Sequence, residues 1–209
     1  MLPLQEQLRQ RIDAWEAAGA PPSVLRIIRD GAALPFQRTP PRFRQRSLQL
    51  RSPAERSAWT SLRDQYLANG AIRRATTDDD VRCISASFLI PKKEPGAYRF
   101  IIDLRRLNKY LRKLHCRYGS LKQLHGRRLS HFVSFDLITD AYHAVGVLPQ
   151  HQTYLGFEVE GELFVCSALP FGLSAYPAIF CSVARVLRAA LLRDFALEPL
   201  KAAAGCLSE

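Results

Sequence analysis

The chain has 209 residues, of which 47% are hydrophobic and 23% charged, a composition that predicts a globular protein with a sizeable core and excludes wholesale disorder. Its 30 lysines and arginines exceed its 19 aspartates and glutamates, which gives a net charge of +11. Such an excess favours a polyanionic partner, nucleic acid or a nucleoside triphosphate, over the alternative of a merely solvated basic surface.

Targeting and redox signals indicate an intracellular protein, cytoplasmic or nuclear. The five cysteines are an odd number, widely spaced and without a Cys-x-x-Cys pair, which argues against a disulfide framework or a zinc knuckle. Charged residues spread through positions 1–20 exclude a secretory signal. Residues 163–184 are uncharged over about the length of a membrane span. Pro170, Gly172 and Pro177 interrupt that stretch, so we expect no membrane partner.

The first 51 residues show one short helix and one irregular segment. Residues 1–20 have the pattern of a short amphipathic helix, which Gly19 and the Pro21-Pro22 pair end. Residues 31–51 are rich in proline and arginine and have no steady period, which predicts an extended linker.

A better-defined helix follows this linker. Ser52 and Glu55 form a capping box, Pro53 takes the first helical position, and Asn69-Gly70 ends the helix. One face of this helix is apolar, so we expect it to pack against the rest of the protein. That face carries Trp59, Leu62 and Tyr66.

Alternating apolar residues predict a first β-hairpin after this helix. Its strands cover residues 84–90 and 98–104, and the turn over 91–97 has a basic tip. A mostly helical basic stretch then runs to about Leu129.

The last part of the chain is predicted to contain a strand, a hairpin and a helix. The strand covers 131–136, and the hairpin joins 154–159 to 162–168 at Glu160-Gly161. The helix runs from about Pro177 to about Arg193.

The basic excess is concentrated in the first hairpin and the stretch after it. From Lys92 to Arg128 there are twelve basic residues and two acids, Glu94 and Asp103. A triphosphate carries several negative charges, so several cations must be placed along it. Arginine can bind its oxygens with a bidentate fork, and lysine supplies a point charge. The hairpin offers Lys92 or Lys93 at its tip and Arg99 on the returning strand.

A lone carboxylate, Asp136, ends the apolar strand over 131–136. At the edge of a sheet this carboxylate can reach a hard cation such as Mg²⁺. Nucleotidyl transfer by two Mg²⁺ ions needs at least two carboxylates. Asp140 follows four residues later, and we interpret it as a helix cap rather than the second ligand.

Three segments occur together in an order that is typical of one enzyme family. They are Arg99-Phe100-Ile101-Ile102-Asp103-Leu104-Arg105-Arg106-Leu107-Asn108, Phe135-Asp136-Leu137-Ile138-Thr139-Asp140-Ala141-Tyr142, and Leu169-Pro170-Phe171-Gly172-Leu173-Ser174-Ala175-Tyr176-Pro177-Ala178-Ile179-Phe180. The first resembles the fingers signature of the reverse transcriptases, the second their motif A and the third their motif B. The form Leu-Pro-Phe-Gly-Leu-Ser is frequent in retroelements of the gypsy-like and DIRS types. The resemblance covers roughly residues 69–193.

The resemblance implies an α+β fold with right-hand polymerase fingers and an incomplete palm. Residues 1–51 then form an N-terminal helix and Pro/Arg-rich linker, and 52–130 form the lead-in helix and the fingers with the basic hairpin. A partial palm with motifs A and B covers 131–193, and a divergent tail covers 194–209.

The resemblance also implies roles for single residues. Asp136 and the backbone carbonyl of Leu137 would hold Mg²⁺, and Tyr142 would exclude ribonucleotides. Arg99, with Lys92 or Lys93, would hold the phosphates of the nucleotide. Phe171 and Gly172 would shape the nucleotide pocket. Asp103 and Arg105 would support the structure of the fingers.

The tail departs from the family pattern. Residues 194–209 contain no Tyr-x-Asp-Asp, and Asp78-Asp79-Asp80 lies too early to replace it, so we expect that run to be a solvated turn. A truncated gene, a frameshift or an error in the gene model would each leave such a tail.

The sequence therefore predicts a reverse-transcriptase fragment of a retroelement polyprotein, inactive as this chain. The resemblance implies that its lineage activity is RNA-directed DNA polymerisation with Mg²⁺ and that its partners are an RNA or DNA template-primer and a deoxynucleoside triphosphate. In a full-length element the rest of the palm, the thumb and an RNase H region would join it. The alternative is a non-catalytic nucleic-acid-binding fragment that retains the basic fingers.

Overall fold

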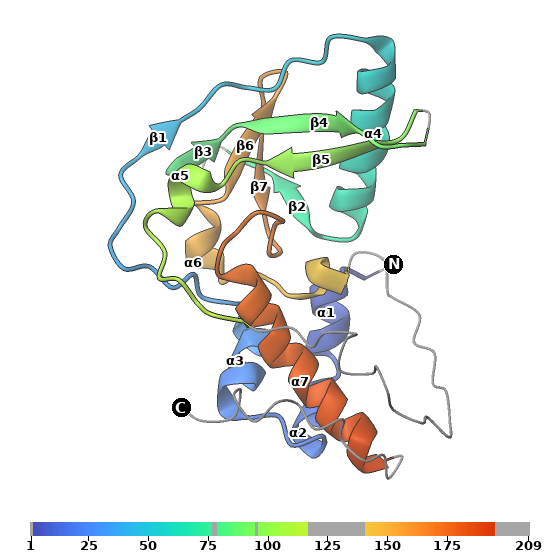
Figure 1. Ribbon diagram of the computed structural model, residues 1–209, viewed down its shortest axis with the longest axis vertical. Coiled ribbons are helices and arrows are strands. Elements are labelled where there is room, and N and C mark those ends of the chain that lie inside the picture. Colours follow the sequence, from blue (N-terminus) through green and yellow to red (C-terminus); the bar gives the residue numbers. More distant parts are fainter. Residues whose placement is uncertain (1, 77–78, 95, 117–140, 195–209) are drawn as a thin grey trace, which may run out of the picture.

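The computed structural model describes residues 2–76, 79–94, 96–116 and 141–194. Within them the chain forms a five-stranded mixed sheet, a two-stranded ribbon and several helices (Figure 1). The sheet and ribbon lie in the upper part of the view, and the longest helix lies below them with the N-terminal helices. The fold class is α+β, as predicted.

The N-terminal region folds into three short helices rather than one. They are α1 (Leu4–Arg9), α2 (Ile12–Ala17) and α3 (Pro22–Asp30). The single helix expected over 1–20 is broken between α1 and α2. Arg11 closes α1 by donating its N–H to the carbonyl of Leu8 and then serves as the N-cap of α2. The break lets α2 bury Trp15, whose side chain is 6% exposed.

Residues 31–51 are extended, as predicted, but they are held along the sheet. β1 (Phe43–Arg44) forms its edge strand, and isolated bridges join Ala32 to Val147 and Leu48 to Val159. Phe43 is buried, so this segment contributes to the core despite its irregular sequence.

Helix α4 (Pro53–Ala68) matches its predicted limits. The Ser52 hydroxyl accepts a hydrogen bond from the Glu55 N–H at 3.1 Å, and the Glu55 carboxylate accepts one from the Arg51 N–H at 2.6 Å. The expected packing face is confirmed by Trp59, which is 4% exposed. Its ring lies 4.9 Å from that of Phe100, 5.6 Å from Phe164 and 6.3 Å from Phe157, between centroids.

The main sheet has the strand order β1-β3-β6-β7-β2. β1 and β6 both pair parallel with β3, whereas β7 pairs antiparallel with β6 and with β2. The predicted second hairpin is confirmed, because Glu160 and Gly161 turn between β6 and β7 with φ of 49° and 86°. The remaining strands are β2 (Ile72–Arg74), β3 (Cys83–Ser85), β6 (Gly156–Val159) and β7 (Glu162–Cys166).

The fingers hairpin forms a separate ribbon of β4 (Ser87–Pro91) and β5 (Tyr98–Ile102). The strand predicted over 84–90 is broken at Ala86, so β3 joins the main sheet and β4 joins the ribbon. The Ala86 N–H donates to the Gln45 side chain at 3.2 Å, and its carbonyl accepts from the Asp103 N–H at 2.7 Å. Neither the N–H nor the carbonyl of Ala86 therefore bonds to a strand of the main sheet.

The C-terminal helix α7 (Tyr176–Asp194) agrees with the helix predicted from about Pro177. It follows β7 and a Gly elbow, so the uncharged stretch over 163–184 is strand, elbow and helix rather than a membrane span. No helix in the described part of the chain is long and apolar enough to cross a membrane. The strand expected over 131–136 lies outside the described residues. Short elements complete the fold: α5 (Arg105–Asn108), the 3₁₀ helix η2 (Ala141–Ala144) and α6 (Pro149–Gln152).

Candidate functional site

Tyr142 of motif A and Phe171 of motif B meet in an aromatic cluster. Their ring centroids lie 5.2 Å apart in an edge-to-face arrangement. The Tyr142 ring also lies 4.6 Å from Tyr176 and 4.6 Å from Phe180, both on α7. Tyr142 is partly buried, whereas Phe171 is 47% exposed. Two predicted pocket residues thus lie side by side, with the Phe171 ring open to solvent and available for a ligand to cover.

Gly172 forms the elbow between β7 and α7, and its backbone has φ +93°, which residues with a side chain rarely adopt. A Cβ at this position would lie 3.2 Å from the Ile102 carbonyl oxygen. The elbow therefore needs glycine both for its conformation and for its close approach to β5, as the sequence predicted.

Asn108 at the end of α5 holds this elbow from outside. Its amide Nδ2 donates to the Gly172 carbonyl at 2.8 Å, and its Oδ1 accepts from the Ser174 N–H at 2.9 Å. Leu107 beside it is fully buried, which anchors the short helix. No role was predicted for Asn108, and its place in the fingers signature was the only signal for it.

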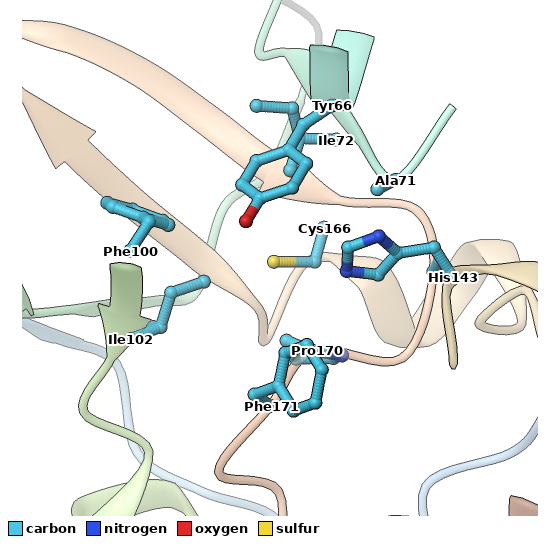
Figure 2. A pocket seen from close by; sticks show the side chains of 10 residues that line it. Tyr66, Ala71, Ile72, Phe100, Ile102, His143, Cys166, Pro170 and Phe171 are labelled. Atoms are coloured by element: carbon cyan, nitrogen blue, oxygen red, sulfur yellow. The ribbon is translucent and has the colours of Figure 1, made fainter. Parts of the chain in front are cut away.

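A small cavity of about 30 Å³ lies beneath Phe171, room for about one water molecule. Figure 2 shows the Tyr66 hydroxyl, the Cys166 sulfur and the His143 ring turned toward it, with Phe171 on the opposite side. Burial raises the pKa of the Cys166 thiol to about 12, so this wall carries a neutral thiol at neutral pH.

The hairpin cations lie along the ribbon rather than in the aromatic cluster. Lys92 and Lys93 are exposed at its tip, and Arg99 is exposed on β5 opposite Ile90. Since Ser87 faces Ile102, Lys92 lies about 17 Å along the ribbon from the level of the elbow, at ~3.4 Å per residue. Arg99 is therefore the hairpin cation nearest to Gly172 along the strand, and the two lysines are remote from it.

Asp103 and Arg105 form an ion pair at the other end of β5. Arg105 donates to the Asp103 carboxylate from Nε at 2.8 Å and from Nη2 at 2.6 Å. This contact holds the pKa of Asp103 below its usual range. The pair lies where the chain leaves the ribbon for α5, which agrees with the expected supporting role.

The acidic run before the fingers is not a simple solvated turn, which corrects the expectation for it. The Asp79 carboxylate accepts two hydrogen bonds from Arg73, at 2.7 and 2.8 Å, and one from the Thr76 N–H at 2.7 Å. These bonds lower the pKa of Asp79 well below its usual range. Asp80 pairs with Arg42 and Arg82, so both described acids tie the loop to its neighbours.

The predicted metal ligands Asp136 and Leu137, like Asp140, lie outside the described residues. In the parts of the chain that the structure describes, no three histidine, cysteine, aspartate or glutamate side chains gather as a metal-holding group. The Mg²⁺ site stays a prediction.

Comparison with known proteins gives a structural match without a sequence match. No protein-family model matches the chain, and no curated protein matches it significantly. The native crystal structure of prototype foamy virus protease-reverse transcriptase matches with a TM-score of 0.59 and 20% identity, over 78% of this chain and 21% of that one. A foamy viral protease-reverse transcriptase in complex with dsDNA matches with a TM-score of 0.55 and 18% identity, over 88% of this chain and 38% of that one.

The chain has a reverse-transcriptase-like fold. At these identities the likeness concerns the fold alone. The chain also corresponds to only 21% to 38% of the length of these viral proteins. In this reverse-transcriptase-like domain, the fingers ribbon, the η2 turn and the Gly172 elbow are the described elements that carry the predicted nucleotide-binding residues.

Proposed function

We propose that this chain is a reverse-transcriptase domain fragment of a gypsy-like or DIRS-type retroelement. Its lineage activity is RNA-directed DNA polymerisation, and its ligands are template-primer and a deoxynucleoside triphosphate. The observation that carries the proposal is the contact between Tyr142 and Phe171 across the Gly172 elbow, within a reverse-transcriptase-like fold.

The proposed site would bind the nucleotide through two surfaces, one aromatic and one cationic. The exposed ring of Phe171 and the adjacent Tyr142 would contact the sugar and base, because flat apolar rings stack on such groups with little loss of freedom. Arg99, with Lys92 or Lys93, would neutralise the phosphates. Asp136 and the carbonyl of Leu137 would hold Mg²⁺, which supplies charge neutralisation at the transferred phosphoryl group.

The contact between Tyr142 and the α7 rings gives the proposed exclusion of ribonucleotides a physical basis. A ring packed against Tyr176 and Phe180 cannot easily move aside for a 2′-hydroxyl. Discrimination then rests on a fixed steric wall, and smaller side chains at Tyr142 should relax it.

A primer-template whose primer lacks its 3′-hydroxyl tests the proposal without requiring catalysis. We expect the next correct deoxynucleotide to slow dissociation of the complex, and the matching ribonucleotide to do so at least tenfold less. The triple variant Lys92→Ala/Lys93→Ala/Arg99→Ala should lose the effect, and Tyr142→Ala should bring the two nucleotides closer together. Deoxynucleotides without effect on the complex would favour the non-catalytic nucleic-acid-binding alternative.

As a 209-residue polypeptide the domain should not extend primers. Two Mg²⁺ ions need more than the carboxylate of Asp136, and loss of a key electrostatic group typically costs about 10²-fold or more in rate. A primer-extension assay on oligo(dT)·poly(rA) with Mg²⁺ or Mn²⁺ measures this. Extension that Asp136→Ala abolishes would show that the chain holds a complete metal site.

A further inference from the structure

An apolar groove lies between α7 and the N-terminal helices α1 and α2, which lie together below the sheet (Figure 1). Its volume is about 420 Å³, within the roughly 300–1,000 Å³ typical of ligand pockets. Leu4, Leu8 and Trp15 line it from the N-terminal helices, and apolar residues of α7 line it from the other side. We call it the α7 groove. Its described lining includes none of the residues proposed to contact the nucleotide.

The α7 side of the groove is one continuous face of that helix. Its lining residues are spaced i, i+3, i+4 and i+7, and they are Phe180, Val183, Ala184 and Leu187. Leu187 is 50% exposed, so the N-terminal helices do not cover this face completely. On the opposite side, the break at Arg11 between α1 and α2 brings Trp15 to the same groove as Leu8.

One cation stands in this apolar lining. Arg11 is the only charged residue among the described residues that line the groove. It is exposed, and no ion pair in the described parts of the chain involves it. A guanidinium can bind both oxygens of a carboxylate through parallel hydrogen bonds. The groove therefore suits a ligand that has an apolar body and one anionic group.

The length of the groove favours a small molecule over a partner helix. From Phe180 to Leu187 the α7 face rises about 10.5 Å, at ~1.5 Å per residue. A partner helix would be held over only about two turns, and helices that short are marginal in water. A small molecule of the same length would be in contact along its whole apolar body.

The groove shares one ring with the candidate site. Phe180 lines the groove, and its ring centroid lies 4.6 Å from that of Tyr142. Ala144 also lines the groove and ends η2, the short helix that carries Tyr142. Tyr142 itself is not among the lining residues. A ligand in the groove would therefore contact two neighbours of Tyr142 and act on its ring indirectly.

We infer that the α7 groove binds a small amphiphilic anion, an apolar chain or ring system with one acid group, and that this ligand stabilises the packed position of Tyr142. The effect on nucleotide selection rests on the proposed function, because it takes Tyr142 as the ring that excludes ribonucleotides. Binding in the groove does not depend on that function.

Decanoate is a suitable probe, because its extended chain is similar in length to the groove. Isothermal titration calorimetry compares it with decylammonium, which has a chain of the same kind and the opposite charge. The parent protein should bind decanoate at least tenfold more tightly than decylammonium. Arg11→Gln should remove most of this preference. Arg26→Gln is the matched control, at an exposed position of α3 outside the groove, and should keep it.

Filling the groove should exclude the ligand. Ala184→Phe adds a ring to the α7 side and should weaken decanoate binding at least tenfold. Ala189→Phe adds the same ring at an exposed position of α7 that does not line the groove, and it should bind as the parent does. Thermal unfolding checks that both variants fold, and the two arginine variants decide the question if Ala184→Phe does not. Equal affinities of the parent for the two probes, or equal losses in the two phenylalanine variants, would overturn the inference.

The link to Tyr142 has its own test. Tyr142→Ala should weaken decanoate binding about threefold, because Phe180 loses a ring against which it packs. By reciprocity, decanoate should increase the preference of the terminated primer-template complex for the deoxynucleotide. Decanoate binding unchanged by Tyr142→Ala would overturn the link. A complex that responds to no nucleotide would count against the proposed function, and the titrations would still decide whether the groove binds the anion.

Discussion

The residues that shape the candidate site act largely through the backbone of the elbow. Gly172 can approach β5 because it has no Cβ, and Asn108 bonds to the backbone on both sides of Leu173. The position of Phe171 therefore depends in part on the hydrogen bonds that Asn108 makes to the elbow backbone. This indirect support distinguishes Asn108 from the residues expected to contact the nucleotide.

Replacing Asn108 by alanine should lower the free energy of unfolding by about 1–2 kcal/mol, since two hydrogen bonds of ~1 kcal/mol each are lost. It should also weaken the effect of the deoxynucleotide on the terminated primer-template. Ser52→Ala is the control, because the Ser52 hydroxyl also accepts a backbone N–H, from Glu55, and Ser52 caps the start of α4. Urea unfolding measures the stability of both variants. If the deoxynucleotide effect on the terminated primer-template were reduced equally in both variants, Asn108 would have no specific role in positioning the elbow.

His151 makes the stability of the fold sensitive to mild acid. Its Nδ1 accepts the Leu34 N–H at 2.9 Å, and its ring packs 5.3 Å from Phe36. Burial lowers its pKa, so the folded protein favours the neutral ring. The unfolded chain then binds the proton more tightly, and the stabilisation is full above about pH 6.5 and falls as the pH drops below it.

The urea midpoint should therefore drop between pH 7.5 and pH 5.5. His151→Asn offers an acceptor that does not titrate, and it should flatten the curve over this window. The exposed His115 gives a control, and His115→Asn should keep the drop. A parent midpoint that does not change across the window would contradict the proposed linkage.

At the scale of elements, the loop over 79–82 can pack against the start of β6 because Gly156, the first residue of that strand, has no side chain. A Cβ at Gly156 would lie 2.5 Å from the Val81 Cγ1 and 3.0 Å from the Cys83 carbonyl oxygen. Gly156→Ala should therefore destabilise the protein by about 1–3 kcal/mol through overpacking. Thermal unfolding compares it with Gly146→Ala, whose Cβ would meet nothing closer than the Gln5 Cγ at 3.4 Å. Equal melting temperatures would mean that the loop can move away freely.

The elements that the sequence predicted well are those fixed by local chemistry. The Ser52 cap determines where α4 starts, and Glu160-Gly161 determines the β6–β7 turn. The break at Ala86 depends instead on Gln45 and Asp103, which are distant from each other in sequence. No local pattern could reveal it.

The same division holds for the candidate site. Tyr142, Phe171 and Gly172 were found from motif order, and their proximity agrees with the predicted pocket. The Asn108 contact was missed because a single asparagine gives no directional signal. The roles of Lys92, Lys93, Arg99 and Asp136 stay predictions.

At the scale of the whole molecule, part of the segment over 31–51 is synthesised long before the residues that it contacts. Ala32 bridges to Val147, and Leu48 bridges to Val159, so the first fifty residues find these partners only near the end of the described chain. A ribosome adding ~5–20 residues per second leaves this segment waiting for roughly 5–20 s. Its cationic, proline-rich composition suits that interval, because such a segment collapses poorly on its own. β1 can pair with β3 as soon as Cys83 and Ile84 have emerged, whereas the chain around Leu48 must wait for β6. Nascent chains should therefore gain protease resistance at Arg46 and Arg51, on either side of Leu48, only after β6 has emerged.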